Sequence, residues 1–151
     1  MWYDQIENIM SKRFSIEPTA YQAMEALENY LKNSGLDKKH SELIKIRASQ
    51  INGCAYCINM HTKDARALGE TEQRIYALNA WRETPFFSPE ERAILALTED
   101  ITNIKHGMNE KTLEEAEKVL DRHAISKVIM AAVIINAWNR IGIGTGMQPA
   151  L

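Results

Sequence analysis

The segment QINGCAYCINMHTKDARALGE, residues 50–70, holds both cysteines of this 151-residue chain and decides how its centre folds. Asn52-Gly53 is a strong turn signal, so we expect the chain to reverse there and to begin a helix at or beside Cys54. Cys57 would then lie in the first helical turn. Unpaired backbone N–H groups and the positive end of the helix dipole stabilise a thiolate at such a place, which makes Cys57 a candidate nucleophile.

The same helix brings a third reactive side chain close to the cysteines. Helical spacing places Cys54, Cys57 and His61 along one face, so His61 could exchange a proton with the sulfur of Cys57. Two thiols at this spacing can also close into a disulfide, and one could resolve a sulfenic acid formed on the other. Glu42, on the preceding helix, could hold His61 in one tautomer once the turn folds the two helices together. These four residues form the candidate catalytic site.

The rest of the chain reads as one helix after another. Prolines and capping residues start several of the predicted helices, at Pro18, Asp37, Thr71, Asn109 and the capping box Ser88-Pro89-Glu90-Glu91. Apolar residues recur at helical spacing after these starts, and glycines commonly follow the last of them. The helices predicted in this way span residues 16–35, 38–52, 54–68, 72–81, 91–104, 110–120 and 124–141, and the last is ended by GIGTG (142–146).

These patterns predict an all-α fold, a single-domain bundle of about seven helices that takes in residues 1–151. No alternating strand pattern of convincing length is found. The last predicted helix is apolar on most of its sides and must therefore be covered on most of them. It is either the central helix of the bundle or part of a subunit interface, so we expect a homo-oligomer.

Composition narrows the location and the partners. A formal net charge of −2 and a pI near 6.1 give no electrostatic reason to bind nucleic acid or an anionic membrane. The longest apolar run, Val128–Ile135, is far shorter than a membrane span. The N-terminal stretch MWYDQIENIM lacks the pattern of a secretory signal, so we expect a cytoplasmic protein. Paired cysteines in that compartment are more often catalytic or metal-binding than structural.

Other interpretations of the cysteine pair stay open at this point. Free cysteines are often buried and inert, and the pair could be two small core residues. The pair could also serve only as a switch in a redox-sensing helical oligomer. Cys54, Cys57 and His61 could supply three zinc ligands of a metal-binding module, although no second cysteine pair or nearby histidine completes the set. We expect no cofactor and no bound metal.

A family resemblance adds to this interpretation. Glu42, eleven residues, Cys54-Ala-Tyr-Cys57, three residues and His61 together resemble the signature of the alkylhydroperoxidase AhpD family, which belongs with the carboxymuconolactone decarboxylase-like proteins. The resemblance runs through ASQINGCAYCINMHTKDARALG (48–69) and resumes in IINAWNRIG (134–142). It implies an all-helical fold and assembly into trimers or hexamers. The relatives named for decarboxylation typically lack the cysteine pair, so its presence argues against that reaction.

The resemblance also implies a mechanism, that of a thiol-dependent peroxidase. Cys57 resembles the thiol that attacks a hydroperoxide and becomes a sulfenic acid, and Cys54 the thiol that resolves it. His61 and Glu42 resemble the proton relay. Recycling the disulfide would need an external dithiol donor, such as a lipoyl protein or a thioredoxin-like partner. Well-studied members carry a histidine just before the second cysteine, where this chain has Tyr56, and a phenol cannot shuttle protons near neutral pH as imidazole can.

Overall fold

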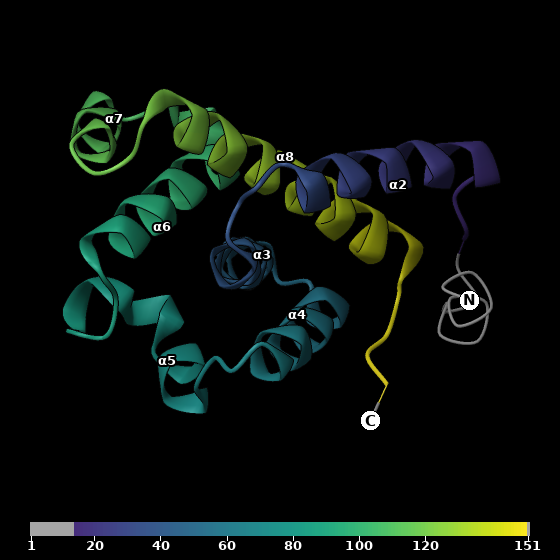
Figure 1. Cartoon of the computed structure of the whole chain (residues 1–151). Helices are drawn as coiled ribbons and strands as arrows, with labels where there is room; N and C mark the ends of the chain where they lie inside the picture. The colour runs from purple at the N-terminus through teal and green to yellow at the C-terminus, as the bar shows by residue number, and fades with distance from the viewer. Residues whose placement is uncertain (1–13, 151) are drawn as a thin grey trace.

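The computed structural model describes residues 14–150, so the stretch MWYDQIENIM lies outside the described residues. Within this range the chain forms seven α-helices and two 3₁₀ helices and contains no strand, which confirms the predicted all-α fold (Figure 1). The elements in chain order are α2 (Pro18–Asn33), α3 (Lys38–Asn52), α4 (Ala55–Ala67), α5 (Glu72–Tyr76), η1 (Leu78–Glu83), α6 (Pro89–Thr102), η2 (Ile104–His106), α7 (Glu110–Glu117) and α8 (Arg122–Thr145).

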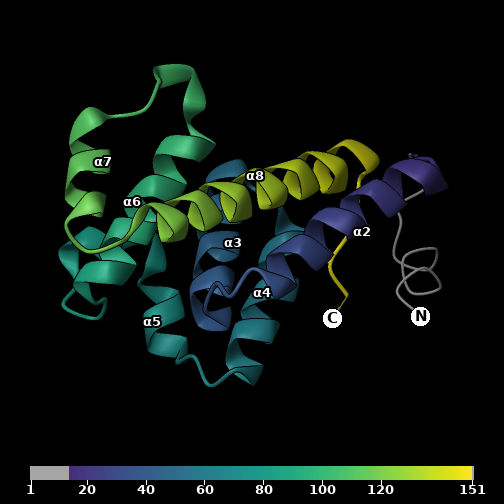
Figure 2. The same ribbon diagram turned by 45° about the horizontal axis from the view of Figure 1, so that its top comes forward.

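Helix α8 is the centre of the bundle. It contacts α3 and α6 along much of its length, α2 beside its C-terminal half, and α4 and α7 near its ends (Figures 1 and 2). Val128, Ala131, Ile134 and Ile135 on this helix are all buried. By length and composition alone α8 could cross a membrane, but half of its most apolar window is buried inside the protein. Its apolar character is that of a helix covered by several others.

The helix starts follow the capping residues that the sequence predicts. Asp37 accepts a hydrogen bond from the backbone N–H of His40 at 3.0 Å, and Asp121 accepts one from Ala124 at 2.7 Å. Ser88 and Glu91 form a reciprocal capping box at the start of α6. Each of these side chains satisfies a backbone donor that the first helical turn leaves unpaired.

The predicted helix over 72–81 is in fact two elements, and this prediction was wrong. Helix α5 ends at Tyr76, and the chain continues as the 3₁₀ helix η1 with a non-helical kink at Ala80. The buried residues here are Ile75, Leu78 and Trp81, which recur every three residues. Three residues per turn is the period of a 3₁₀ helix, so this geometry keeps their side chains on one side, against the core.

The end of α8 also differs from the prediction. The helix passes through Gly142 and Gly144 and ends only at Gly146, whose φ of 76° is left-handed. A glycine inside a helix costs roughly 0.5–1 kcal/mol relative to alanine, so the sequence alone favoured a stop at Gly142. Packing explains its place in the helix, because the cysteine sulfurs lie directly against Gly142.

A half-buried carboxylate joins three elements on the side of the bundle away from the cysteines. Glu99 on α6 accepts hydrogen bonds from Arg47 of α3 and from the indole N–H of Trp81 of η1, both at 2.9 Å, and also from Arg82. Burial alone would raise the pKa of Glu99, but the hydrogen bonds from Arg82, Trp81 and Arg47 outweigh it and hold the pKa below its usual range.

The Glu99 carboxylate should therefore make stability depend on pH. A depressed pKa contributes stability that is present above the unfolded-state pKa of Glu and is lost as the pH falls through the folded value. We expect Glu99→Gln to lower the free energy of unfolding by about 2 kcal/mol near pH 7 and by much less near pH 3, measured by urea denaturation. Exposed Glu115 is the control, and Glu115→Gln should leave the urea midpoint unchanged. An equal loss at both pH values for Glu99→Gln would contradict this account.

Candidate active site

The turn between α3 and α4 sets the position of the cysteines. Gly53 adopts a left-handed φ of 71°, a conformation that residues with a side chain rarely take. This conformation allows the chain to reverse. The backbone N–H of Cys54 donates to the carbonyl of Ser49 at 3.0 Å, and that of Gly53 donates to Gln50 at 3.3 Å. This is a Schellman motif, and it closes α3 at Asn52, so that only Gly53 and Cys54 separate α3 from α4. The predicted reversal at Asn52-Gly53 is thus confirmed.

The two cysteines occupy the start of α4 and form a disulfide. Cys54 is the N-cap residue and Cys57 lies in the first turn, with their Cα atoms 5.3 Å apart and both residues 2% exposed. The backbone N–H of Cys57 donates to the sulfur of Cys54 at 3.4 Å. A backbone N–H of the first helical turn therefore donates to the sulfur of Cys54. From the sequence we expected the start of the helix to stabilise the thiolate of Cys57 instead.

Asparagines on α8 anchor this turn. The side-chain N–H₂ of Asn52 donates to Asn136 and to Asn139, both at 2.9 Å, and Asn139 in turn donates to the hydroxyl of Ser49 at 2.9 Å. Asn139 is fully buried, so these bonds replace the water that its amide would otherwise need. This network was not predicted from the sequence, although two asparagines one turn apart in an apolar helix were a signal for it.

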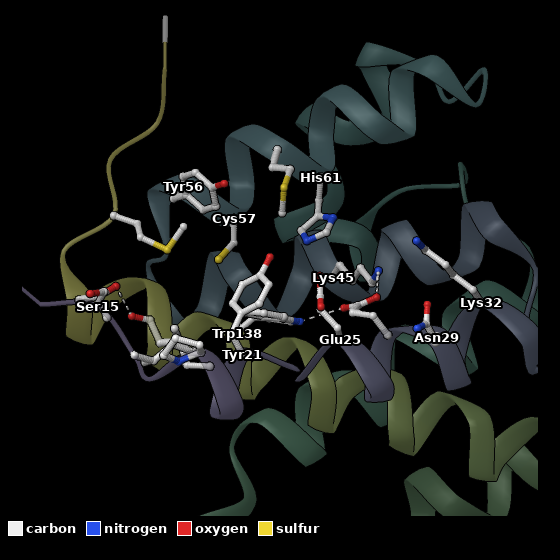
Figure 3. Close-up of a pocket in the computed structure, with 17 residues that line it drawn as sticks. Ser15, Tyr21, Glu25, Asn29, Lys32, Lys45, Tyr56, Cys57, His61 and Trp138 are labelled. Atoms are coloured by element: carbon white, nitrogen blue, oxygen red, sulfur yellow. Dashed lines mark hydrogen bonds and ion pairs between the residues drawn. The ribbon is translucent and has the colours of Figure 1, made fainter. Parts of the chain in front are cut away.

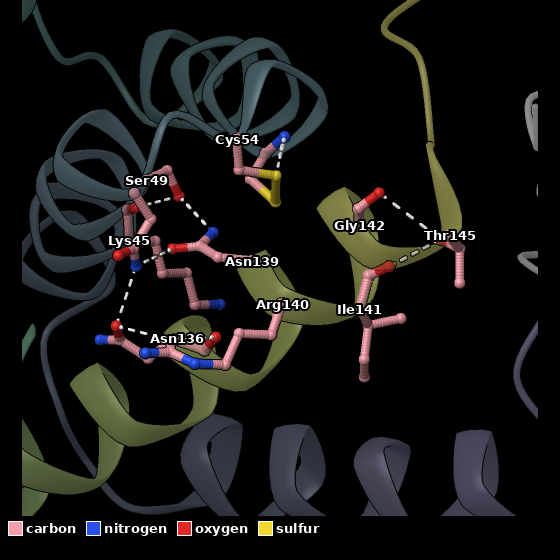
Figure 4. Close-up of a disulfide and its surroundings, with 11 residues drawn as sticks. Lys45, Ser49, Cys54, Asn136, Asn139, Arg140, Ile141, Gly142 and Thr145 are labelled. Atoms are coloured by element: carbon pink, nitrogen blue, oxygen red, sulfur yellow. Dashed lines mark hydrogen bonds between the residues drawn. A yellow bond between two sulfur atoms is a disulfide. The ribbon is translucent and has the colours of Figure 1, made fainter.

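Gly142 of α8 lies directly against the disulfide (Figure 4). A Cβ atom at this position would come within 3.2 Å of the Cys54 sulfur and 3.7 Å of the Cys57 sulfur. The first distance is shorter than ordinary van der Waals contact, so a side chain here would require the sulfur or the helix to shift by a few tenths of an ångström. The pair is thereby covered on the α8 side.

Glu42 and His61 form a hydrogen-bonded pair beside the cysteines. The Nδ1 atom of His61 lies 2.9 Å from Oε2 of Glu42, and the two side chains are 7% and 12% exposed. The structure thus brings Glu42 of α3 against α4, as the four-residue site requires. Among the described residues the hydrogen-bond partner of His61 is Glu42, and neither sulfur is bonded to the ring.

A third acid–base group, Asp64, adjoins this pair on the protein surface. One ligand atom from each of Glu42, His61 and Asp64 lies within 4.8 Å of the others. Burial and then the nearby charge of Glu42 raise the pKa of the Asp64 carboxyl, against the opposing effect of His61 and Lys45. The zinc set that the sequence left open differs from this cluster, since its cysteine sulfurs are bonded to each other here.

A cavity of about 590 Å³ opens onto Cys57 and His61 (Figure 3). Its walls come from α2, α3, α4 and α8 and from the segments that flank the bundle. Glu28 of α2 braces one wall, because it accepts from Lys45 of α3 at 3.3 Å and from the indole of Trp138 of α8 at 3.0 Å. Apolar side chains make up much of the remaining lining, among them Ile16, Tyr21, Met60, Ile141 and Met147.

Tyr56 also lines this cavity, next to Cys57. Burial raises the pKa of its phenol above the usual value, so the group is neutral at physiological pH. It can donate a hydrogen bond but cannot accept a proton as a histidine would. Tyr56 therefore does not replace the histidine that the well-studied relatives carry at this position.

Comparisons with known proteins agree with the geometry. The sequence pattern of the carboxymuconolactone decarboxylase family matches residues 18–100, a range that includes all four candidate residues. The uncharacterized protein YdfG of Bacillus subtilis is 45% identical over 145 residues, which are 93% of this chain and 99% of YdfG. Alkyl hydroperoxide reductase AhpD of Mycobacteroides abscessus is 40% identical over only 47 residues, 31% of this chain and 27% of that protein.

A solved structure gives the same picture. A protein of unknown function from Agrobacterium tumefaciens, a candidate AhpD antioxidant defence protein, superposes with a TM-score of 0.87 at 40% identity. The match covers 89% of this chain and 93% of the other. The fold is therefore that of AhpD-like proteins.

The contact at Gly142 can be tested against the neighbouring glycine of the same helix. Gly144→Ala meets no atom within 4 Å and should raise the free energy of unfolding by about 0.5–1 kcal/mol, the usual gain of alanine in a helix. Gly142→Ala should instead lower the free energy of unfolding of the oxidised protein by about 1–2 kcal/mol, because it overpacks the disulfide. Urea denaturation measures both. An equal gain in the two variants would show that the sulfurs do not need this glycine.

Proposed function

Because the chain belongs to the carboxymuconolactone decarboxylase family, whose named members are enzymes, we propose that it is a thiol-dependent peroxidase of the AhpD type. The observation that carries the proposal is the joint placement of a cysteine pair and a hydrogen-bonded His61–Glu42 pair at one cavity. A decarboxylation needs no change of oxidation state. A disulfide between two cysteines of one helical turn, at the wall of a substrate-sized cavity, favours a redox reaction instead.

The proposed oxidation begins on Cys57, the sulfur that faces the cavity. His61 takes the proton of the Cys57 thiol, and the thiolate attacks the terminal oxygen of a hydroperoxide. The O–O bond breaks, and the departing alkoxide recovers a proton from the imidazolium to become an alcohol. Cys57 is left as a sulfenic acid.

The second step forms the disulfide seen in the structure. The sulfur of Cys54 attacks the sulfur of the Cys57 sulfenic acid, and hydroxide leaves with a proton as water. Two thiols have then lost two electrons, and one hydroperoxide has become an alcohol and water. Glu42 assists by accepting from Nδ1 of His61, which favours the protonated ring while the proton is held.

The partners and location of the protein are part of the same proposal. An external dithiol donor, either a lipoyl or a thioredoxin-like protein, would reduce the disulfide in the cytoplasm. Val133 and Ile143 are exposed apolar residues on α8, and Tyr30 is another on α2. Exposed apolar side chains on a central helix support a homo-oligomer, a trimer or a hexamer.

Peroxide-driven loss of thiols tests this function directly. We expect the reduced protein to lose two free thiols per chain on treatment with one equivalent of cumene hydroperoxide at neutral pH, as counted with Ellman's reagent. The Cys57→Ser variant keeps only the thiol of Cys54, and we expect the hydroperoxide not to consume it at the wild-type rate. Cys54→Ser should stop at a sulfenic acid, which dimedone traps on Cys57.

Two outcomes would contradict the peroxidase. One is no loss of thiols at neutral pH. The other is slow loss accompanied by a disulfide-dependent change of oligomeric state, which would favour a redox-sensing role for the same cysteine pair.

The role of Glu42 can be separated from that of the cysteines. Glu42→Gln keeps the size of the side chain but removes the charge that holds His61. We expect the second-order rate constant for oxidation of Cys57 to fall about tenfold to a hundredfold, measured by stopped-flow with cumene hydroperoxide. Glu72→Gln, at an exposed carboxylate on α5, is the matched control and should keep the wild-type rate. A wild-type rate in Glu42→Gln would remove Glu42 from the relay.

A further inference from the structure

The two sulfurs of the disulfide differ in their access to an incoming thiol. Cys57 lines the cavity of about 590 Å³, together with His61 and Met60. Cys54 does not line this cavity, and its sulfur is turned to α8, where it lies 3.2 Å from the place that a Cβ of Gly142 would take. Both residues are only 2% exposed, so a thiol can reach the pair only by entering the cavity. It then meets Cys57 first.

The two sulfurs also differ as leaving groups. The sulfur of Cys54 accepts the backbone N–H of Cys57 at 3.4 Å and caps α4, so negative charge that develops on it falls at the positive end of the helix. In thiol–disulfide exchange a sulfur that better bears negative charge leaves faster. Access and leaving ability therefore select the same direction of attack.

We propose that the reducing dithiol attacks Cys57, forms its mixed disulfide there, and expels Cys54 as the leaving thiolate. This step rests on the proposed function, since it completes the cycle that the peroxide begins. A donor thiolate attacks Sγ of Cys57, a donor–Cys57 bond forms, and the Cys54–Cys57 bond breaks with its electron pair on Cys54. Cys57 thus reacts with oxidant and reductant in turn, at the same end of one cavity.

The second half of the exchange releases the protein. The other thiol of the donor, as a thiolate, attacks the donor sulfur of the mixed disulfide and expels the thiolate of Cys57. The donor leaves as a disulfide, having given two electrons to the protein. The two protons that the donor thiols lose are matched by those that Cys54 and Cys57 take up.

The site of attack can be mapped without any peroxide. Wild-type protein, oxidised with diamide, is mixed briefly with 2-mercaptoethanol, acidified and alkylated with N-ethylmaleimide. Trypsin releases both cysteines in the peptide 48–63, and fragmentation between them assigns each adduct. We expect mercaptoethanol on Cys57 and maleimide on Cys54, with the reverse pattern at least on the order of tenfold rarer.

Unfolded protein is the control for this mapping. In guanidinium chloride the difference in access is lost, and the two patterns should become comparable. Mercaptoethanol mainly on Cys54 of the folded protein would overturn the proposal. Since the disulfide is made with diamide, a chain that fails to react with hydroperoxide could still give the expected pattern, so the two failures are distinguishable.

A substitution in the cavity gives a second, independent readout. Met60→Trp should slow reduction of the disulfide by dithiothreitol on the order of tenfold, because the donor shares the space that the larger side chain fills. Met108→Trp is the control, at an exposed methionine outside the cavity lining, and should be reduced at the wild-type rate. Unchanged reduction in Met60→Trp would show that the donor arrives by another route.

Discussion

The site depends on one packing constraint, the contact of the cysteine turn with the central helix. The reversal from α3 to α4 is closed by Gly53, tied to α8 through Asn52 and covered by Gly142. Loss of any one of these would let the start of α4 move relative to the cavity. Catalytic groups usually need to be held to within a fraction of an ångström, and here three glycine or asparagine positions do so.

The site also places charged and polar groups where burial is costly. The His61–Glu42 pair and the Lys45–Glu28 pair each lie between helices with little exposure to water. Such pairs contribute little to stability, because the desolvation of both partners offsets their attraction. Their placement is therefore better explained by chemistry at the cavity than by the needs of the fold. By contrast, Glu99 holds its partners on the far side of the bundle, where no candidate catalytic group lies.

The sequence predicted the parts of the molecule that local chemistry decides. Asp37 and the Ser88 capping box marked helix starts because their side chains bond their own first turn. The turn at Asn52-Gly53, and the helix that follows it, could be predicted because this dipeptide favours a reversal, which Gly53 makes with its left-handed φ. Glu42 could be chosen among the acidic residues only through the family spacing, since nothing local distinguishes it from other surface acids.

Contacts between distant segments could not be predicted in this way. The continuation of α8 through Gly142 depends on sulfur atoms from another helix, so a local rule took it for a stop. The change from α-helix to 3₁₀ helix after Tyr76 allows Leu78 and Trp81 to pack in the core. The bond from the start of α4 to Cys54 instead of Cys57 depends on the side-chain geometry of the cap itself. The fold class and the candidate residues could be predicted from the sequence. Which sulfur caps α4 and which one lines the cavity could not.

The central claim is that the sulfur of Cys57 ionises easily when the pair is reduced, since it shares a cavity with His61, and Glu42 holds that histidine in place. The pH dependence of its alkylation by iodoacetamide, with each adduct assigned by mass spectrometry, measures this most directly. The account predicts an apparent pKa for Cys57 well below the ~8.5 of an ordinary thiol. A value at or above ~8.5 would contradict it and would return the pair to two buried, unreactive core residues.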